Sequence, residues 1–177
     1  MVGKRNDNVP PPRLSARARK AVLVVHIGSA GAWIGLDVAM AVVVFTAVLS
    51  EDGRTRAVCF EALELFAVWP LFVAGLLCLV SGVALGYGSR YGLVRYWWVA
   101  TKLAVSVVLV TLVPLALRPG LEGLGELGRE LAAGHLVTAP IGDMIYPPIV
   151  SPAALLFALV LAVFKPWGLI RRRPERT

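Results

Sequence analysis

Four apolar runs, each long enough to cross a bilayer as a helix, constrain what this chain can fold into. They cover residues 22–47, 66–87, 97–117 and 145–164. A bilayer core of about 30 Å needs roughly 20 apolar residues in helical form. Only helices and closed barrels satisfy every backbone group in lipid, and these runs lack the alternation of barrel strands. The sequence therefore predicts an all-α membrane protein, a bundle of four transmembrane helices.

Composition agrees with a membrane class and divides the chain into three parts. Apolar residues make up 58% of the 177, and the mean hydropathy is +0.74. Globular proteins contain about 45 to 50% apolar residues. Residues 1–20 read as a basic tail, residues 21–168 as the transmembrane domain with its four spans, and residues 169–177 as a second basic tail.

The net charge of +7 follows membrane topology. If both termini are cytoplasmic, 14 of the 18 lysines and arginines lie on that side, as the positive-inside rule requires. An even number of spans also puts both termini on one side, and we expect a multi-pass protein of the bacterial inner (cell) membrane. Basic tails of this kind are attracted to anionic lipid. They lack the interleaved aromatic residues of nucleic-acid binding, so the expected partner is the bilayer and not a nucleic acid.

One carboxyl group interrupts the first apolar run. Asp37 and His26 are the only ionisable residues between positions 21 and 49. At about 100° per residue they lie on one helix face, roughly 16 Å apart, with Ser29, Trp33 and Met40 on the same stripe. Such a carboxyl should face protein or water, not lipid. Two interpretations of Asp37 remain open, a neutral hydrogen-bonding group within the bundle and a member of a proton relay.

The opposite face of the first helix carries small residues that allow close helix packing. They are Gly28, Ala32, Gly35 and Ala39. Small residues four apart let two helix backbones approach closely in a membrane. Two covered faces on one helix would require neighbours on both sides or a second copy of the chain, although a chain rich in alanine, glycine and valine produces such spacing readily.

The segments between the apolar runs also contain patterns that indicate helices. Apolar residues between positions 57 and 65 allow the second helix to begin before its membrane entry. In the longest loop, residues 118–148, leucines recur against glutamates. This spacing favours a short amphipathic helix on the outer surface, weakened by Gly123, Gly125 and Gly128, and is equally compatible with a loop that covers the mouth of the bundle.

Motifs of soluble enzymes are absent from the sequence. It contains no phosphate-binding loop, dinucleotide fingerprint or zinc-protease motif, and no CxxC pair. Cys59 and Cys78 are most simply small apolar residues. We therefore predict a non-enzymatic accessory or interaction protein without a metal or other cofactor. Its partner beyond the bilayer would be a second copy or another membrane protein.

Three motifs in order resemble a family. They are His26 with Trp33 and Gly35, residues 91–99 (YGLVRYWWV) leading to Lys102, and residues 165–168 (KPWG). They are similar to a bacterial family of small four-helix integral membrane proteins of unknown function, frequent in actinobacteria. A histidine before Trp-x-Gly more remotely resembles the copper-resistance D-type proteins and the haem-binding J-type protoporphyrinogen oxidases.

The remote resemblance implies haem ligation by His26, so the alternative function is a membrane haem-binding redox protein. The chain departs from the family pattern at the start of the fourth helix, where residues 149–153 (IVSPA) contain no histidine. The only other histidine, His135, belongs to the loop expected on the opposite side of the membrane from His26. A haem with two histidine ligands needs both imidazoles at similar depth.

Overall fold

The structure, a computed structural model, describes residues 15–87, 93–135, 142–165, 168 and 170. Its elements run α1 Ala16–Leu49, α2 Gly53–Phe66, α3 Trp69–Tyr87, α4 Trp97–Leu112, the π-helix η1 Val113–Leu117, α5 Arg118–Leu121, α6 Leu124–Ala132, the 3-10 helix η2 Gly142–Ile145 and α7 Pro147–Phe164. Most of both basic tails, together with the Tyr91-Gly92 and Pro166-Trp167 parts of the family-like motifs, lies outside the described residues.

Four helical stretches of the described chain are long and apolar enough to cross a membrane. They are Ala16–Leu49, Gly53–Tyr87, Trp97–Ala132 and Pro147–Phe164. The all-α, four-helix prediction is therefore confirmed. The first stretch is the longest single helix, with 34 residues or about 51 Å, so it extends well beyond a bilayer core of about 30 Å.

Local capping explains where the first two helices begin. The Ser15 hydroxyl accepts a hydrogen bond from the backbone N–H of Ala18, which caps α1. Asp52 caps α2 by accepting from the Thr55 N–H at 2.9 Å and from the Thr55 hydroxyl at 2.6 Å. These hydrogen bonds stabilise the carboxylate and hold the pKa of Asp52 below its usual value.

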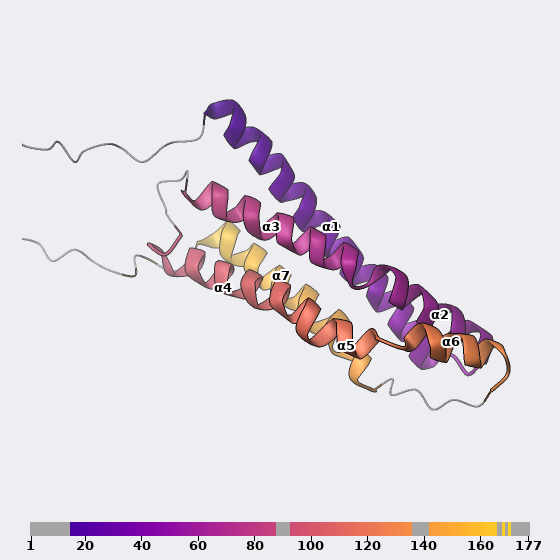
Figure 1. Ribbon diagram of the computed structural model, residues 1–177. Coiled ribbons are helices and arrows are strands. Elements are labelled where there is room, and N and C mark those ends of the chain that lie inside the picture. Colours follow the sequence, from indigo (N-terminus) through magenta and orange to yellow (C-terminus); the bar gives the residue numbers. More distant parts are fainter. Residues whose placement is uncertain (1–14, 88–92, 136–141, 166–167, 169, 171–177) are drawn as a thin grey trace, which may run out of the picture.

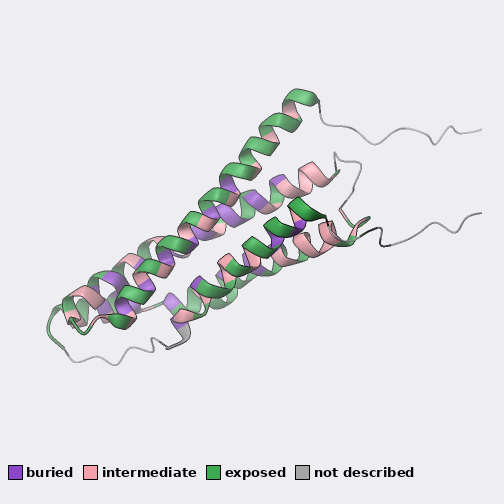
Figure 2. Cartoon of the chain, turned by 180° about the vertical axis from the view of Figure 1, so that it is seen from behind, coloured by how far each residue is buried: buried purple, intermediate pink, exposed green. Residues whose placement is uncertain are grey.

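The spanning helices surround one axis in the order α1, α3, α4, α7. α1 packs mainly on α3 and also on α7, and α4 packs on both α3 and α7 (Figure 1). Near the termini, the first turns of α1 diverge from the other helices, as two opposite views show (Figures 1 and 2). We call this the terminal end of the bundle, and the opposite one the α2–α6 end.

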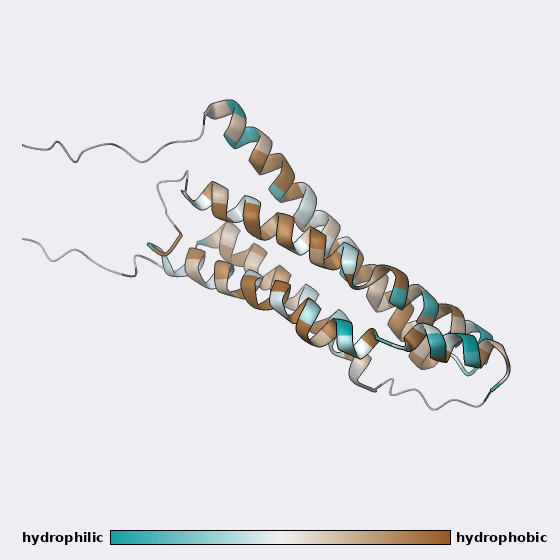
Figure 3. Cartoon of the chain, viewed as in Figure 1, coloured by the Kyte–Doolittle hydropathy of each residue, from teal (hydrophilic) through white to brown (hydrophobic). Residues whose placement is uncertain are grey.

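Two apolar cores lie along this axis. One joins α1, α3 and α4 around Trp33, Leu71 and Leu109. The other joins the last turns of α1 to α2 and α6 around Val44, Phe60 and Leu124. Purple, buried segments mark both in Figure 2. The spanning helices are largely brown, or apolar, in Figure 3, and many of their large apolar side chains are exposed, as a lipid-facing surface requires.

The α2–α6 end contains a short amphipathic helix, α6, which is one of the two arrangements that the loop sequence allowed, but its glycines act differently from the expectation. α6 packs against α2. A Cβ added at Gly128 would lie 2.9 Å from the Ala57 carbonyl oxygen, and one at Gly125 would meet the Glu64 carboxylate. These glycines therefore permit close approach of two helices, which compensates for their low helix propensity.

Candidate functional site

The predicted stripe on α1 faces the interior of the bundle. Ser29, Trp33, Asp37 and Met40 are all buried, and His26, nearer the start of the helix, is half-buried. Trp33 packs against Gly75 of α3, where an added Cβ would lie 3.1 Å from the indole. The structure thus turns the whole stripe toward the other helices, while its functional role remains a prediction.

Asp37 is paired with a residue from the last helix. Its side chain is 0% exposed, and the hydroxyl of Ser151 on α7 donates a hydrogen bond of 2.7 Å to Asp37 Oδ2. The second carboxyl oxygen, Asp37 Oδ1, is buried without a hydrogen-bond partner among the described residues, and so is Trp33 Nε1. Buried polar atoms without partners are uncommon, so these two atoms need an explanation.

Asp37 lies at the level of the first turns of α7. Its partner Ser151 comes roughly 8 Å along the helix after Tyr146, an exposed aromatic residue at the start of α7. On α3, Gly75 beside Trp33 comes roughly 9 Å after exposed Trp69.

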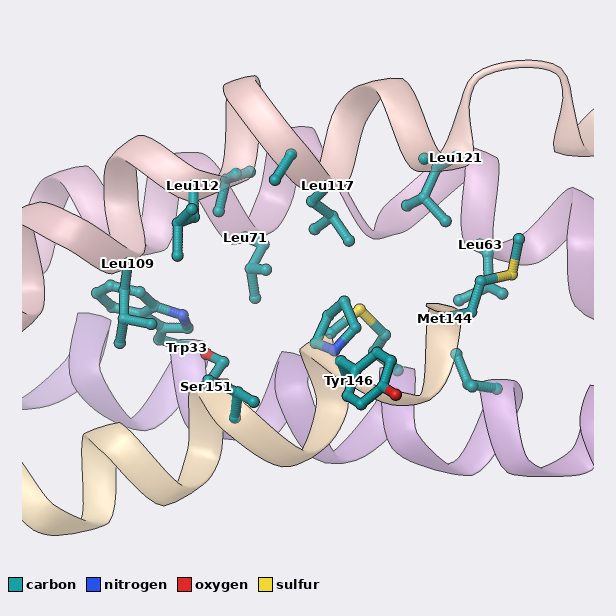
Figure 4. A pocket seen from close by; sticks show the side chains of 17 residues that line it. Trp33, Leu63, Leu71, Leu109, Leu112, Leu117, Leu121, Met144, Tyr146 and Ser151 are labelled. Atoms are coloured by element: carbon teal, nitrogen blue, oxygen red, sulfur yellow. The ribbon is translucent and has the colours of Figure 1, made fainter. Parts of the chain in front are cut away.

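An apolar cavity of about 420 Å³ lies beside this pair, between α1, α4 and the start of α7. Figure 4 shows Trp33 and Ser151 near one end and Leu121 and Met144 near the other. Its wall is apolar except for a few polar atoms, and the lining residues are Trp33, Met40, Val44, Leu63, Leu71, Leu109, Leu112, Val113, Ala116, Leu117, Gly120, Leu121, Met144, Tyr146, Pro147, Val150 and Ser151.

The cavity has exposed residues on two neighbouring elements of its wall. Leu112, Ala116 and Gly120 form one edge, and Tyr146 and Val150 of the α7 region form the other. Because these exposed residues lie on or beside spanning helices, we infer an opening between them that faces laterally. We call it the lateral opening.

A π-helix forms one wall of the lateral opening. Residues 113–117 of η1 include Pro114, which has no backbone N–H to donate. A π-helical turn widens the helix locally and is frequent at functional sites. The sequence signal for this irregularity is Pro114 within the third apolar run.

A second cavity, of about 340 Å³, lies toward the terminal end. Its wall combines apolar residues with Arg19, His26 and Lys102, and we call it the basic cavity. His26 Nδ1 lies 3.0 Å from the Cys78 carbonyl oxygen and 3.1 Å from Ser81 Oγ. These contacts fix the orientation of the imidazole against α3, where Gly82 leaves room for the ring.

The small-residue face of α1 is directed outward. Gly28, Ala32, Gly35 and Ala39 are all exposed, and an added Cβ at Gly28 or Gly35 would have nothing within 4 Å. Within the described chain no helix covers this face. Close packing through these residues therefore remains a prediction that concerns a second copy or another membrane protein.

The residues present do not fit a haem held by two histidines. His26 lies in the basic cavity, whereas His135 is exposed just after α6, at the α2–α6 end. Two ligands at opposite ends of the bundle cannot bind one iron. Among the described residues, no group of three or more histidine, cysteine, aspartate or glutamate side chains could hold a metal ion, and Cys59 and Cys78 are both free.

Comparisons of the chain with models of protein families, with curated proteins and with solved structures found no match. The two cavities and the buried pair are therefore the features that indicate function. Sequence reasoning had missed Ser151, because a serine near the start of an apolar helix carries no local sign that it faces a carboxyl group on another helix.

Proposed function

We propose that this chain is a non-enzymatic, multi-pass protein of the bacterial inner membrane that binds a lipid-soluble molecule in its apolar cavity. The observation that carries the proposal is the cavity itself, about 420 Å³ in volume and apolar, with exposed wall residues on η1 and α7 from which we infer the lateral opening. Small-molecule sites are concave and mostly apolar, with a few polar groups that fix orientation.

The polar groups at the Trp33 end favour an amphipathic ligand. Trp33 Nε1 is a donor without a partner among the described residues, and the Ser151 hydroxyl is held by Asp37 Oδ2 at 2.7 Å. A ligand with an apolar body would fill the cavity, and a carbonyl or hydroxyl oxygen on it would accept from the indole N–H. This occupant would satisfy a buried donor that otherwise carries a desolvation cost.

The lateral opening supports entry from the bilayer and not from water. Its edges, Leu112 and Ala116 on one side and Val150 on the other, are apolar and belong to the sides of spanning helices. A molecule dissolved in the lipid would reach the cavity without crossing a polar surface. This route fits an accessory protein that holds or presents a membrane-dissolved molecule to a partner.

A fluorescent apolar probe, N-phenylnaphthylamine, tests the proposal in detergent-solubilised protein. Ala116→Phe adds a ring at the edge of the opening and should weaken probe binding by about tenfold, equivalent to about 1.4 kcal/mol. The matched control is Leu115→Phe, because Leu115 is 71% exposed, is the neighbouring residue and does not line the cavity. Equal binding by both variants and the parent would reject the cavity as a ligand site.

Absorbance of the same purified protein tests the haem alternative. We expect no Soret band, because the second histidine lies at the far end of the bundle. A Soret band that His26→Ala eliminates would replace our proposal with a haem-binding function.

A further inference from the structure

The charged residues of the described chain are separated along the bundle axis. The terminal end contains Arg17, Arg19, Lys20, His26, Arg95, Lys102 and Lys165, and no carboxylate among the described residues. Among the described residues whose side chains are placed, the acidic ones lie at the α2–α6 end or, for Asp37, near it. No described carboxylate at the terminal end therefore neutralises the positive charge of the basic cavity.

Two cationic groups face this cavity from different helices. Arg19 belongs to the diverging first turns of α1, and Lys102 belongs to α4, where it is partly buried. Neither side chain forms an ion pair with a described residue. The one salt bridge among the described residues joins Arg118 to Glu122, away from this cavity. A cation held partly out of water without a counter-charge is costly, so an anionic occupant would offset that cost.

The depth of the cavity matches a lipid headgroup with its chains. Lys102 comes roughly 8 Å along α4 after Trp97, which is 54% exposed at the helix start. Exposed aromatic residues at this position are typical of the membrane interface. The rest of the wall is largely aliphatic, including Leu23, Leu79 and Leu103, which are suited to contact acyl chains.

From this arrangement we infer that the basic cavity binds one phospholipid with an anionic headgroup. The phosphate lies between Arg19 and Lys102, and the acyl chains lie against the aliphatic wall. Basic pockets between transmembrane helices on the cytoplasmic side bind anionic headgroups by this combination of charge and apolar contact. This site is separate from the apolar cavity and does not depend on its ligand.

Native mass spectrometry in a non-ionic detergent tests the inference, because micelles present no continuous anionic surface. Phosphatidylglycerol and phosphatidylcholine with identical acyl chains serve as probes. We expect one phosphatidylglycerol to bind about tenfold more tightly than phosphatidylcholine, and Arg19→Gln with Lys102→Gln to remove that preference. Equal affinity of the parent for both lipids would overturn the inference.

The matched control is Arg17→Gln with Lys20→Gln. Both residues are exposed on the same turns of α1 as Arg19, and neither lines the cavity. Their substitution removes two positive charges, as the Arg19 and Lys102 double variant does. This control should keep the preference for phosphatidylglycerol. An equal loss of that preference in both double variants would show only a general attraction to basic charge and would overturn the site. If Lys102→Gln does not fold, Arg19→Gln against Lys20→Gln decides the question by the same criterion.

Inorganic phosphate separates a lipid from a soluble anion. At millimolar concentration it should leave phosphatidylglycerol bound, because the acyl chains contribute to lipid affinity and phosphate lacks them. Displacement of the lipid by phosphate at that concentration would mean that the cavity binds a small soluble anion, and it would reject the phospholipid.

Discussion

At the scale of single residues, the contact between Asp37 and Ser151 links the first helix to the last through a buried hydrogen bond. The carboxyl group is 0% exposed, and the Ser151 hydroxyl is the hydrogen-bond donor to Oδ2. Removing one partner of a buried hydrogen bond leaves the other unsatisfied, which costs more than the net value of the bond. Asp37 therefore depends on a residue of the last helix.

We predict that Ser151→Ala lowers the free energy of unfolding by about 1 to 3 kcal/mol. Asp37→Asn keeps shape and hydrogen-bonding capacity and should stay near the parent, whereas Asp37→Lys should fold poorly. Thermal unfolding in detergent provides the measurement. Thr46→Ala is the control, because that hydroxyl is exposed and bonds only its own helix. If Ser151→Ala and Thr46→Ala had the same small effect, the pair would have no structural value.

At the scale of elements, glycines on α3 determine how closely α1 approaches. A Cβ at Gly75 would lie 3.1 Å from Trp33 and 3.1 Å from Val110, and one at Gly82 would lie 3.1 Å from His26. These distances are shorter than ordinary carbon contacts of about 3.5 to 4.0 Å. The large side chains of the α1 stripe therefore fit into a surface of α3 that small residues provide.

Replacement by leucine should have different effects at Gly75, on the face of α3 that meets α1, and at Gly35, on the outward face of α1. Gly75→Leu should greatly reduce the yield of folded monomer, because the added side chain would collide with Trp33 and Val110. Gly35→Leu should leave the monomer folded, because nothing lies within 4 Å of an added Cβ there. Yield and circular dichroism measure the fold, and light scattering measures the oligomer.

If two copies pack through the outward face of α1, Gly35→Leu should convert dimers to monomers. A parent that is monomeric in detergent would remove the small-residue face as a dimer contact. A folded, high-yield Gly75→Leu variant would contradict the close approach of α1 and α3.

At the scale of the whole molecule, the separation of charge predicts orientation. The described bases of the terminal end have no described carboxylate beside them. The sequence count assigns 14 of the 18 lysines and arginines to one side of the membrane if both termini lie there. The positive-inside rule then predicts that this end is cytoplasmic and that the α2–α6 end lies across the membrane.

Green fluorescent protein and alkaline phosphatase, each fused after Thr177, test this orientation. We expect fluorescence from the first fusion and no phosphatase activity from the second, because the former folds in the cytoplasm and the latter outside it. An active phosphatase fusion would reverse the topology. A thiol reagent applied to Cys59 is a weaker reporter, because that side chain is only 8% exposed.

The sequence by itself determined the class of fold and much of the layout of the helices. Apolar runs such as 97–117 are local signals, and lipid leaves helices as the only way to satisfy the backbone of these segments. The spacing of His26, Trp33 and Asp37 also identified the inward face of α1, because helical periodicity is a property of one segment.

Only the tertiary structure decided what that face meets. Ser151 lies 114 residues from Asp37 in the chain, and their contact depends on the rotation and axial position of α7 relative to α1. The same variables determine the apolar cavity beside η1 and the seating of α6 on α2 through Gly128. Local hydropathy leaves them undetermined, because lipid-facing and buried surfaces of a membrane helix are both apolar and packing alone distinguishes them.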